Sequence, residues 1–156
     1  MPEHVIEIGT WKGHGSTYFI AEALDYNKKG VLHSIERERG FHDEAARLYR
    51  NKLSYLKDRV DLNFGQSTDI LPGIIEKCGG VIDLVFFDGS QHEHEAYNEY
   101  KILEPHLRPG SYIVFHDWMT EKCNLMRPTI RESGKWRMDI LLSDGNWFAG
   151  FERIAK

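Results

Sequence analysis

Four acidic side chains stand inside or directly after short apolar runs of this chain. Glu7 lies within the run Val5–Ile8, and Glu36, Asp88 and Asp117 each come at the end of a later run. Carboxylates can accept hydrogen bonds from hydroxyl groups, bind hard cations such as Mg²⁺ or Ca²⁺, or take up a proton. If the fold gathers these residues, we expect an oxygen-rich site for a cation or a ligand with several hydroxyl groups.

Histidines accompany two of these carboxylates. His116 directly precedes Asp117, while His92 and His94 follow Asp88. Because histidine titrates near neutral pH, His92 is the first candidate for a base that accepts a hydroxyl proton, and His94 is the second. The alternative is that both belong to a solvated His-Glu-His-Glu helix start. Zinc binding by His92 and His94 lacks the further ligand spacing that a zinc site needs.

A glycine-rich segment follows the first apolar run. Gly9, Gly13 and Gly15 have the spacing G-x-x-x-G-x-G and precede a predicted helix over residues 16–26. Glycines allow positive φ and close approach of a ligand, and the first N–H groups of the helix point back over the turn. The spacing differs from the dinucleotide pattern G-x-G-x-x-G, and the negative charge of Glu7 would repel a diphosphate. The alternative is a tight turn that binds nothing.

Alternating apolar and amphipathic stretches predict the elements that position these residues. Strands are expected over 5–8, 31–36, 60–64, 81–88 and 111–117, and helices over 16–26, 43–56, 69–78 and 96–107, with Pro109-Gly110 as a helix break. Residues 119–135 should be partly helical, and 137–142 with 147–154 should form a hairpin with its tip at 143–146. This order predicts an α/β fold: a doubly wound, mostly parallel sheet with helices on both faces and a C-terminal antiparallel hairpin.

In such a sheet the carboxyl ends of the strands share one edge, where ligands bind near the switch point of strand order. Neighbouring strands lie about 4.8 Å apart, so Asp88 and Asp117 could share one ligand. An acidic residue at the end of the second strand is the usual holder of ribose hydroxyls, and Glu36 occupies that place. Its alternative is a solvated charge at a strand end.

The motifs Glu7-x-Gly9-x-x-x-Gly13, Asp88-Gly89-Ser90, Pro109-Gly110 and His116-Asp117 resemble those of class I S-adenosylmethionine-dependent methyltransferases. The resemblance spans nearly the whole chain and is strongest to small-molecule O-methyltransferases, including metal-dependent enzymes acting on sugars of macrolide antibiotics. It implies a Rossmann-like fold and O-methylation of a small molecule such as a sugar or another hydroxylated metabolite.

The resemblance also implies roles for individual residues. The cofactor S-adenosylmethionine would be held by Glu7, Gly9, Thr10, Gly13, Gly15, Ser16, Glu36, Gln66, Ser67 and Asp88. Asp88, His92 and Asp117 would be catalytic, and Asp88 with Asp117 would bind Mg²⁺ or another divalent cation. Three positions depart from the family pattern: Gln66 replaces an Asp beside adenine, Gln91 stands where the family has its His, and His116 replaces an acidic metal ligand.

Composition sets the remaining expectations. The chain has 156 residues, a net charge of −4 and two cysteines without metal or redox spacing. We therefore expect a single domain over residues 1–156 in a reduced, cytoplasmic setting, with no nucleic-acid partner and no membrane segment. Little sequence precedes Val5 to cover an acceptor, so the acceptor site should be open or completed by a second subunit in a homo-oligomer.

Two other functions remain open at this point. A non-catalytic nucleoside-binding or assembly module would account for the missing cover over the acceptor. An NAD-dependent oxidoreductase would share the fold, but the chain lacks both its glycine pattern and a clear proton-donor constellation.

Overall fold

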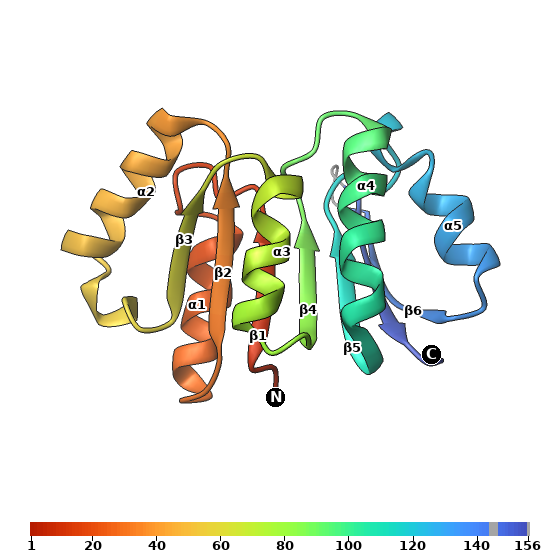
Figure 1. Cartoon of the computed structure of the whole chain (residues 1–156), viewed down its shortest axis with the longest axis horizontal. Helices are drawn as coiled ribbons and strands as arrows, with labels where there is room; N and C mark the ends of the chain where they lie inside the picture. The colour runs from red at the N-terminus through yellow and green to blue at the C-terminus, as the bar shows by residue number, and fades with distance from the viewer. Residues whose placement is uncertain (144–146, 156) are drawn as a thin grey trace.

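The structure is a computed structural model that describes residues 1–143 and 147–155. A seven-stranded sheet with the order β3-β2-β1-β4-β5-β7-β6 forms its centre (Figure 1). The strands are β1 (His4–Ile8), β2 (Val31–Glu36), β3 (Val60–Phe64), β4 (Ile82–Phe87), β5 (Leu107–Phe115), β6 (Trp136–Leu142) and β7 (Phe148–Arg153). The strands β3, β2, β1, β4 and β5 are parallel, and β7 lies antiparallel between β5 and β6.

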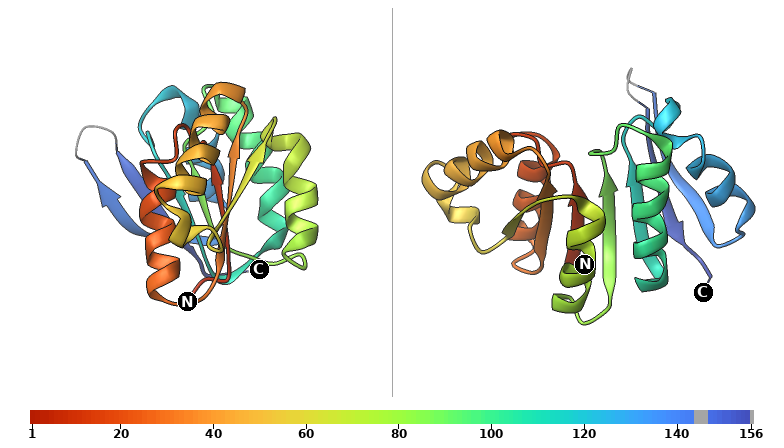
Figure 2. Two further views of the ribbon diagram at one scale, coloured as in Figure 1. Left: turned by 90° about the vertical axis from the view of Figure 1, so that its left-hand side faces the viewer. Right: turned by 45° about the horizontal axis from the view of Figure 1, so that its top comes forward.

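Helices cover both faces of the sheet (Figure 2). They are α1 (Ser16–Tyr26), α2 (Arg39–Asn51), α3 (Ser67–Lys77), α4 (Glu93–Leu103) and α5 (Met126–Glu132), with 3-10 turns at Ser54–Leu56, Glu104–His106 and Glu121–Cys123. The largest core cluster joins the sheet to α3, α4 and α5, while Val5 and Leu32 face Leu24 of α1 on the other side. The predicted doubly wound α/β fold with a C-terminal antiparallel hairpin is confirmed.

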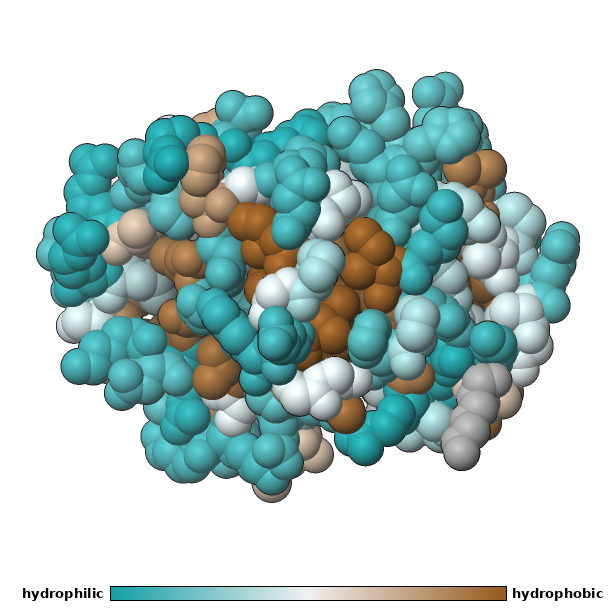
Figure 3. All heavy atoms as spheres, in the orientation of Figure 1, coloured by the Kyte–Doolittle hydropathy of each residue, from teal (hydrophilic) through white to brown (hydrophobic). Residues whose placement is uncertain are grey.

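The alternation of side chains along each strand assigns residues to the two faces. Ile6 and Ile8 of β1 and Ile35 of β2 lie in the core under α3 and α4. Apolar atoms remain visible in the middle of this face, surrounded by hydrophilic side chains (Figure 3). Because both faces are covered, the parallel strands consist largely of apolar runs, which is why they could be predicted.

The largest differences from the predicted boundaries concern three elements. The second helix begins at Arg39 instead of residue 43 and ends at Asn51, followed by a separate 3-10 turn at Ser54–Leu56. The fourth helix begins at Glu93 instead of residue 96 and ends at Leu103. The fifth strand begins at Leu107, and His116 and Asp117 follow it instead of belonging to it.

Pro109-Gly110 therefore lies inside β5 and is not the helix break that was expected. The pairing of β5 with β4 shifts between the partners Ile82–Leu107 and Leu84–Tyr112. This irregular stretch comes before Tyr112, the first residue of β5 that pairs with β7. A proline, which has no N–H to donate, is therefore tolerated there.

The C-terminal hairpin is present as β6 and β7, whereas residues 144–146 of its expected tip lie outside the described residues. Within residues 1–143 and 147–155, no helix has the length and apolar character needed to cross a membrane.

Candidate functional site

The turn after β1 crosses the turn after β4 at the point where strand order reverses. Gly9 has φ of +104°, and a Cβ on it would lie 2.6 Å from the Gly89 backbone N. A Cβ on Gly89 would lie 2.9 Å from the Gly9 backbone N. Since the conflict is with backbone that cannot rotate away, both positions require glycine. The sequence interpretation identified Gly9 but gave no separate role to Gly89.

The other two glycines of the turn differ from each other. Gly13 has φ of +76°, its carbonyl accepts a hydrogen bond from the Tyr49 hydroxyl at 3.1 Å, and Ala45 and Tyr49 of α2 leave little room for a Cβ. Gly15 precedes α1, and a Cβ on it would meet no atom of the described residues within 4 Å. Gly13 therefore fixes the turn against α2, whereas Gly15 leaves open space beside the start of α1.

Glu7 lies under the turn and is fully buried. Its carboxylate accepts hydrogen bonds from the hydroxyls of Ser16 at 2.5 Å, Thr17 at 2.7 Å and Ser34 at 2.5 Å. Thr10 is also buried, with its hydroxyl 2.5 Å from that of Ser34. Burial raises the pKa of Glu7, while the three hydroxyl donors act in the opposite direction. Glu7 thus positions the turn and the first residues of α1, and it is not open to a ligand.

Glu36 ends β2 beside this turn and is 7% exposed. One carboxylate oxygen accepts a hydrogen bond from the backbone N of Trp11 at 2.7 Å, and the other accepts one from the backbone N of Glu38 at 2.8 Å. Trp11 itself has a positive φ of 49°. These two bonds fix the direction of the carboxylate at the rim of the cavity described next.

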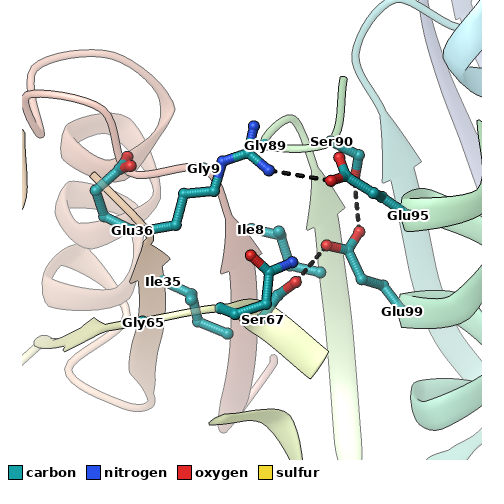
Figure 4. A pocket seen from close by; sticks show the side chains of 12 residues that line it. Ile8, Gly9, Ile35, Glu36, Gly65, Ser67, Gly89, Ser90, Glu95 and Glu99 are labelled. Atoms are coloured by element: carbon teal, nitrogen blue, oxygen red, sulfur yellow. Dashed lines mark hydrogen bonds and ion pairs between the residues drawn. The ribbon is translucent and has the colours of Figure 1, made fainter. Parts of the chain in front are cut away.

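A cavity lies between the carboxyl ends of β1, β2, β3 and β4 (Figure 4). Its lining includes Ile8, Gly9, Ile35, Glu36, Gly65, Gln66, Ser67, Gly89, Ser90 and Glu99. The isoleucines form an apolar wall, and the carboxylates stand on either side of it (Figure 4). A flat apolar ring with polar substituents fits such a lining.

Glu99 of α4 closes one side of this cavity and was not singled out from the sequence. It is 2% exposed and accepts hydrogen bonds from the hydroxyls of Ser67 at 2.5 Å and Ser90 at 2.6 Å. Burial raises the pKa of Glu99, and the two serine hydroxyls lower it. The Ser67 hydroxyl is therefore directed to Glu99, and Gln66 is the other predicted cofactor residue lining this part of the cavity.

A second group of charged residues lies beyond β4 and β5. His116 Nδ1 is 2.9 Å from Asp88 Oδ1 and 3.0 Å from Asp117 Oδ2. Lys122 Nζ is 3.1 Å from the same Asp117 oxygen and 3.6 Å from Asp88 Oδ1. Burial raises the pKa of Asp88, and the neighbouring His116 and Lys122 oppose this shift. We call Asp88, His116, Asp117 and Lys122 the carboxyl-end cluster.

Three members of this cluster have the geometry of a cation site. Ligand atoms of Asp88, His116 and Asp117 all lie within 4.8 Å of one another. Among the described residues, His116 Nδ1 is buried without a hydrogen-bond partner, although two carboxylate oxygens are close. The residues present therefore fit a divalent cation, and a histidine ligand suits a transition-metal ion better than Ca²⁺.

Lys122 complicates this fit and was missed in the sequence interpretation. Its side chain is only 9% exposed, and its ammonium already neutralises part of the charge of Asp88 and Asp117. Nothing in the local sequence Glu121-Lys122-Cys123 distinguishes it from a surface lysine, because the 3-10 turn that directs it inward is a tertiary feature.

The structure brings together most of the predicted site residues. His92 is exposed, precedes α4, and is not among the residues that line the cavities containing Gly9, Asp88 or Asp117. His94 is also exposed, with its ring 4.0 Å from Glu93. The histidine that lies beside Asp88 is His116.

A family model described as "Methyltransferase domain" matches residues 6–118. A catechol O-methyltransferase from Niastella koreensis is 30% identical over 113 residues, which cover 72% of this chain and 48% of that protein. The chain thus spans about half the length of this curated relative.

Solved structures share the fold over nearly the whole chain. The O-methyltransferase TomG from Streptomyces achromogenes, in complex with SAM, has a TM-score of 0.82 at 20% identity, covering 99% of this chain and 74% of that one. An O-methyltransferase from Bacillus cereus in complex with SAH has a TM-score of 0.77 at 19% identity, covering 99% and 74%.

Proposed function

Since this chain belongs to the methyltransferase-domain family, we propose that it transfers a methyl group from S-adenosylmethionine to an oxygen of a small hydroxylated molecule. The observation that carries the proposal is the cavity at the switch point, bounded by Gly9, Glu36 and Ser67. The names of the catechol O-methyltransferase relative and of the SAM-bound structural neighbour support the same chemistry.

In this proposal the cavity receives the nucleoside part of the cofactor. Glu36 accepts hydrogen bonds from the ribose hydroxyls, and adenine lies against Ile8 and Ile35 with Gln66 at its edge. Gly9, Gly13, Gly15, Thr10 and Ser16 shape the turn beside the methionine part, and the buried Glu7 keeps that turn in place. S-adenosylmethionine supplies a methyl group on a positively charged sulfur.

The carboxyl-end cluster faces the position that the acceptor would take. Asp88 lines cavities on both sides, one with Gly9 and Glu36 and the other with Asp117 and Lys122. We assign Asp88 and Asp117 to orienting the acceptor hydroxyl, and either Asp88 or His116 to accepting its proton as the oxygen–methyl bond forms and the sulfur–methyl bond breaks. His92, predicted from the sequence as the base, is exposed and is not among the residues lining these two cavities, so we favour the cluster residues for this role.

A divalent cation held by Asp88, His116 and Asp117 would lower the pKa of the acceptor hydroxyl. His116 would then be a ligand and could not be the base. Mg²⁺ was the first expectation from the sequence, and the histidine favours a transition-metal ion such as Mn²⁺ or Fe²⁺ over Mg²⁺ because Mg²⁺ prefers oxygen ligands.

Calorimetric titration with S-adenosylmethionine tests the cofactor assignment. We expect saturable binding that weakens at least tenfold in Glu36→Gln, because the amide removes one acceptor. Glu76→Gln, which makes the same charge change on the exposed side of α3, should bind normally. Absence of binding by the unaltered protein would refute the proposal.

Turnover of small alcohols and phenols separates the proposed enzyme from a module that binds the nucleoside without catalysis. Formation of S-adenosylhomocysteine that depends on the acceptor supports the enzyme. Binding without turnover of any acceptor, with and without Mg²⁺ or Mn²⁺, would favour the module. The finer expectations of a sugar acceptor, a homo-oligomer, a reduced cytoplasmic setting and no nucleic-acid partner remain part of the proposal.

A further inference from the structure

A second group of metal-binding side chains lies at the opposite end of the sheet. His4 begins β1, His33 lies near the start of β2, and Cys78 directly follows α3. The register places His4 opposite Val31 and Ile6 opposite His33, so both histidines lie at the amino ends of neighbouring strands. In Figure 1 this is the lower end of the sheet, where α3 ends near the N-terminus. We call His4, His33 and Cys78 the amino-end cluster.

The three residues are close enough to share one ion. A ring nitrogen of each histidine and the Cys78 sulfur all lie within 4.8 Å of one another. His33 is 7% exposed and Cys78 is 5% exposed, whereas His4 is partly buried. Such a buried group of nitrogen and sulfur atoms is unusual without a reason, because each polar atom loses its contact with water.

Two observations show that side-chain atoms of this cluster are available to bind an ion. Among the described residues, His4 Nδ1 is buried without a hydrogen-bond partner. Cys78 is a free cysteine, so no disulfide accounts for its place in the cluster. The cluster therefore contains an unsatisfied donor or acceptor beside an uncommitted sulfur.

Asp61 fixes the orientation of one ring. Its Oδ2 is 3.0 Å from His33 Nδ1, which leaves His33 Nε2 as the nitrogen free to bind an ion. Histidines that bind metals commonly donate their second N–H to a carboxylate in this way. The Asp83 carboxylate accepts a hydrogen bond from the backbone N–H of His4 at 3.0 Å. This bond holds the start of β1 against β4.

We propose that the amino-end cluster binds Zn²⁺ through Cys78 Sγ and one ring nitrogen each of His4 and His33, with water in the fourth position. Two nitrogens and one sulfur form a donor set that suits Zn²⁺, whereas Mg²⁺ and Ca²⁺ require oxygen ligands. The bound ion would join β1, β2 and the end of α3. The cavity of the proposed methyl transfer lies at the other end of these strands, so the ion would take no part in that reaction.

Binding must release the thiol proton of Cys78. Burial raises the pKa of this thiol to about 11, with the charges of Asp61 and Asp83 acting in the same direction and Lys77 opposing them. The ion binds the thiolate, so apparent affinity should rise with pH.

Cobalt substitution tests the site without relying on activity. We expect the purified chain to bind Co²⁺ stoichiometrically, to show thiolate-to-cobalt charge-transfer absorption, and to lose that absorption when Zn²⁺ is added. Cys78→Ser should abolish the absorption. Cys123→Ser, which alters the other free and buried cysteine far along the chain, should retain it.

A second variant covers the outcome that Cys78→Ser does not fold. His4→Gln lies at the beginning of β1, where the side chain is only partly buried, and should weaken Co²⁺ binding at least tenfold while the fold is retained. Absence of charge-transfer absorption in the unaltered protein, or its persistence in Cys78→Ser, would overturn the proposal.

The test is independent of the proposed methyl transfer. Asp88→Asn with Asp117→Asn should leave the charge-transfer absorption unchanged, since these residues contribute no sulfur. Zn²⁺ binding that these changes remove and Cys78→Ser leaves intact would assign the ion to the carboxyl-end cluster and refute the amino-end site.

Discussion

The two ends of the sheet carry clusters of different chemistry, one after β4 and β5 and the other at the start of β1 and β2. At the carboxyl end, two carboxylates meet one histidine and a lysine ammonium. At the amino end, two histidines meet a cysteine, and a carboxylate holds one of the rings from outside. The first cluster is rich in oxygen and combines two acidic groups with a lysine, whereas the second offers nitrogen and sulfur.

This difference indicates that one sheet can bind an exchanging ligand at one end and a retained ion at the other. The carboxyl end opens into cavities between turns and suits a ligand that exchanges. The amino end is enclosed by packed elements, so an ion bound there would stay with the fold. The two clusters share no residue, so substitutions can alter the ligand atoms at one end without changing those at the other.

The largest expected effect concerns the crossing turns of the carboxyl end. Gly9→Ala should lower the free energy of unfolding by about 3 kcal/mol, because its Cβ meets the backbone of Gly89 and its φ is +104°. Thermal unfolding measures this loss, and the folded fraction should bind S-adenosylmethionine poorly. Gly73→Ala in α3, where a Cβ has open space, should be neutral or stabilising. Equal effects of the two changes would refute the backbone argument.

Removing the carboxylate of Asp88 should distinguish the two ends by their affinity for metal ions. Asp88→Asn should weaken Mn²⁺ binding at the carboxyl end about 100-fold, since a direct ligand is lost. Calorimetry measures the affinity, and the exposed Asp69→Asn is the charge-matched control. Unchanged Mn²⁺ affinity would mean that Asp88 serves the acceptor or cofactor alone.

Lys122 offers a smaller test of the same cluster. Its ammonium competes with a divalent cation for Asp88 and Asp117, so Lys122→Met should tighten Mn²⁺ binding about tenfold, within the range expected for a close charge pair. The exposed Lys57→Met should have no effect. Weaker Mn²⁺ binding in Lys122→Met would show that the lysine supports the site instead of competing for it.

The smallest effects are pH-dependent and have opposite signs at the two ends. Burial raises the pKa of Glu99 above its ordinary 4.5, so its stabilising contribution is lost as pH rises through the raised value. Glu99→Gln should therefore gain stability relative to the unaltered protein with rising pH, by about 1 kcal/mol or less.

Asp61 at the amino end behaves in the opposite way. Partial burial would raise its pKa, but the hydrogen bond with His33 and the charge of Lys77 lower it below the ordinary 3.8. Its contribution is present above 3.8 and is lost as pH falls through the lowered value. Asp61→Asn should be less stable than the unaltered protein near neutral pH and should approach it in acid. Unfolding curves over a pH series for both variants check the signs, and parallel curves would contradict this difference.

The fold followed from sequence because its signals are local. The predicted strands 31–36 and 60–64 and the helix 16–26 match the structure at both ends, since apolar residues recur along each of them and glycines stand at the neighbouring turns. The region near Pro109-Gly110 was misassigned, because proline and glycine end helices in most contexts and only the shifted pairing with β4 tolerates them inside β5.

Local patterns were sufficient to predict the α/β order, the glycine turn and the acidic residues at strand ends, because each is encoded within a few neighbouring residues. Which of these residues meet depends on how the strands pair and the helices pack. Glu7 proved to be buried among hydroxyls, His92 is exposed, and Lys122 lies beside Asp88 and Asp117. The amino-end cluster likewise joins residues 4, 33 and 78, since strand pairing and helix packing bring together positions that no local pattern connects.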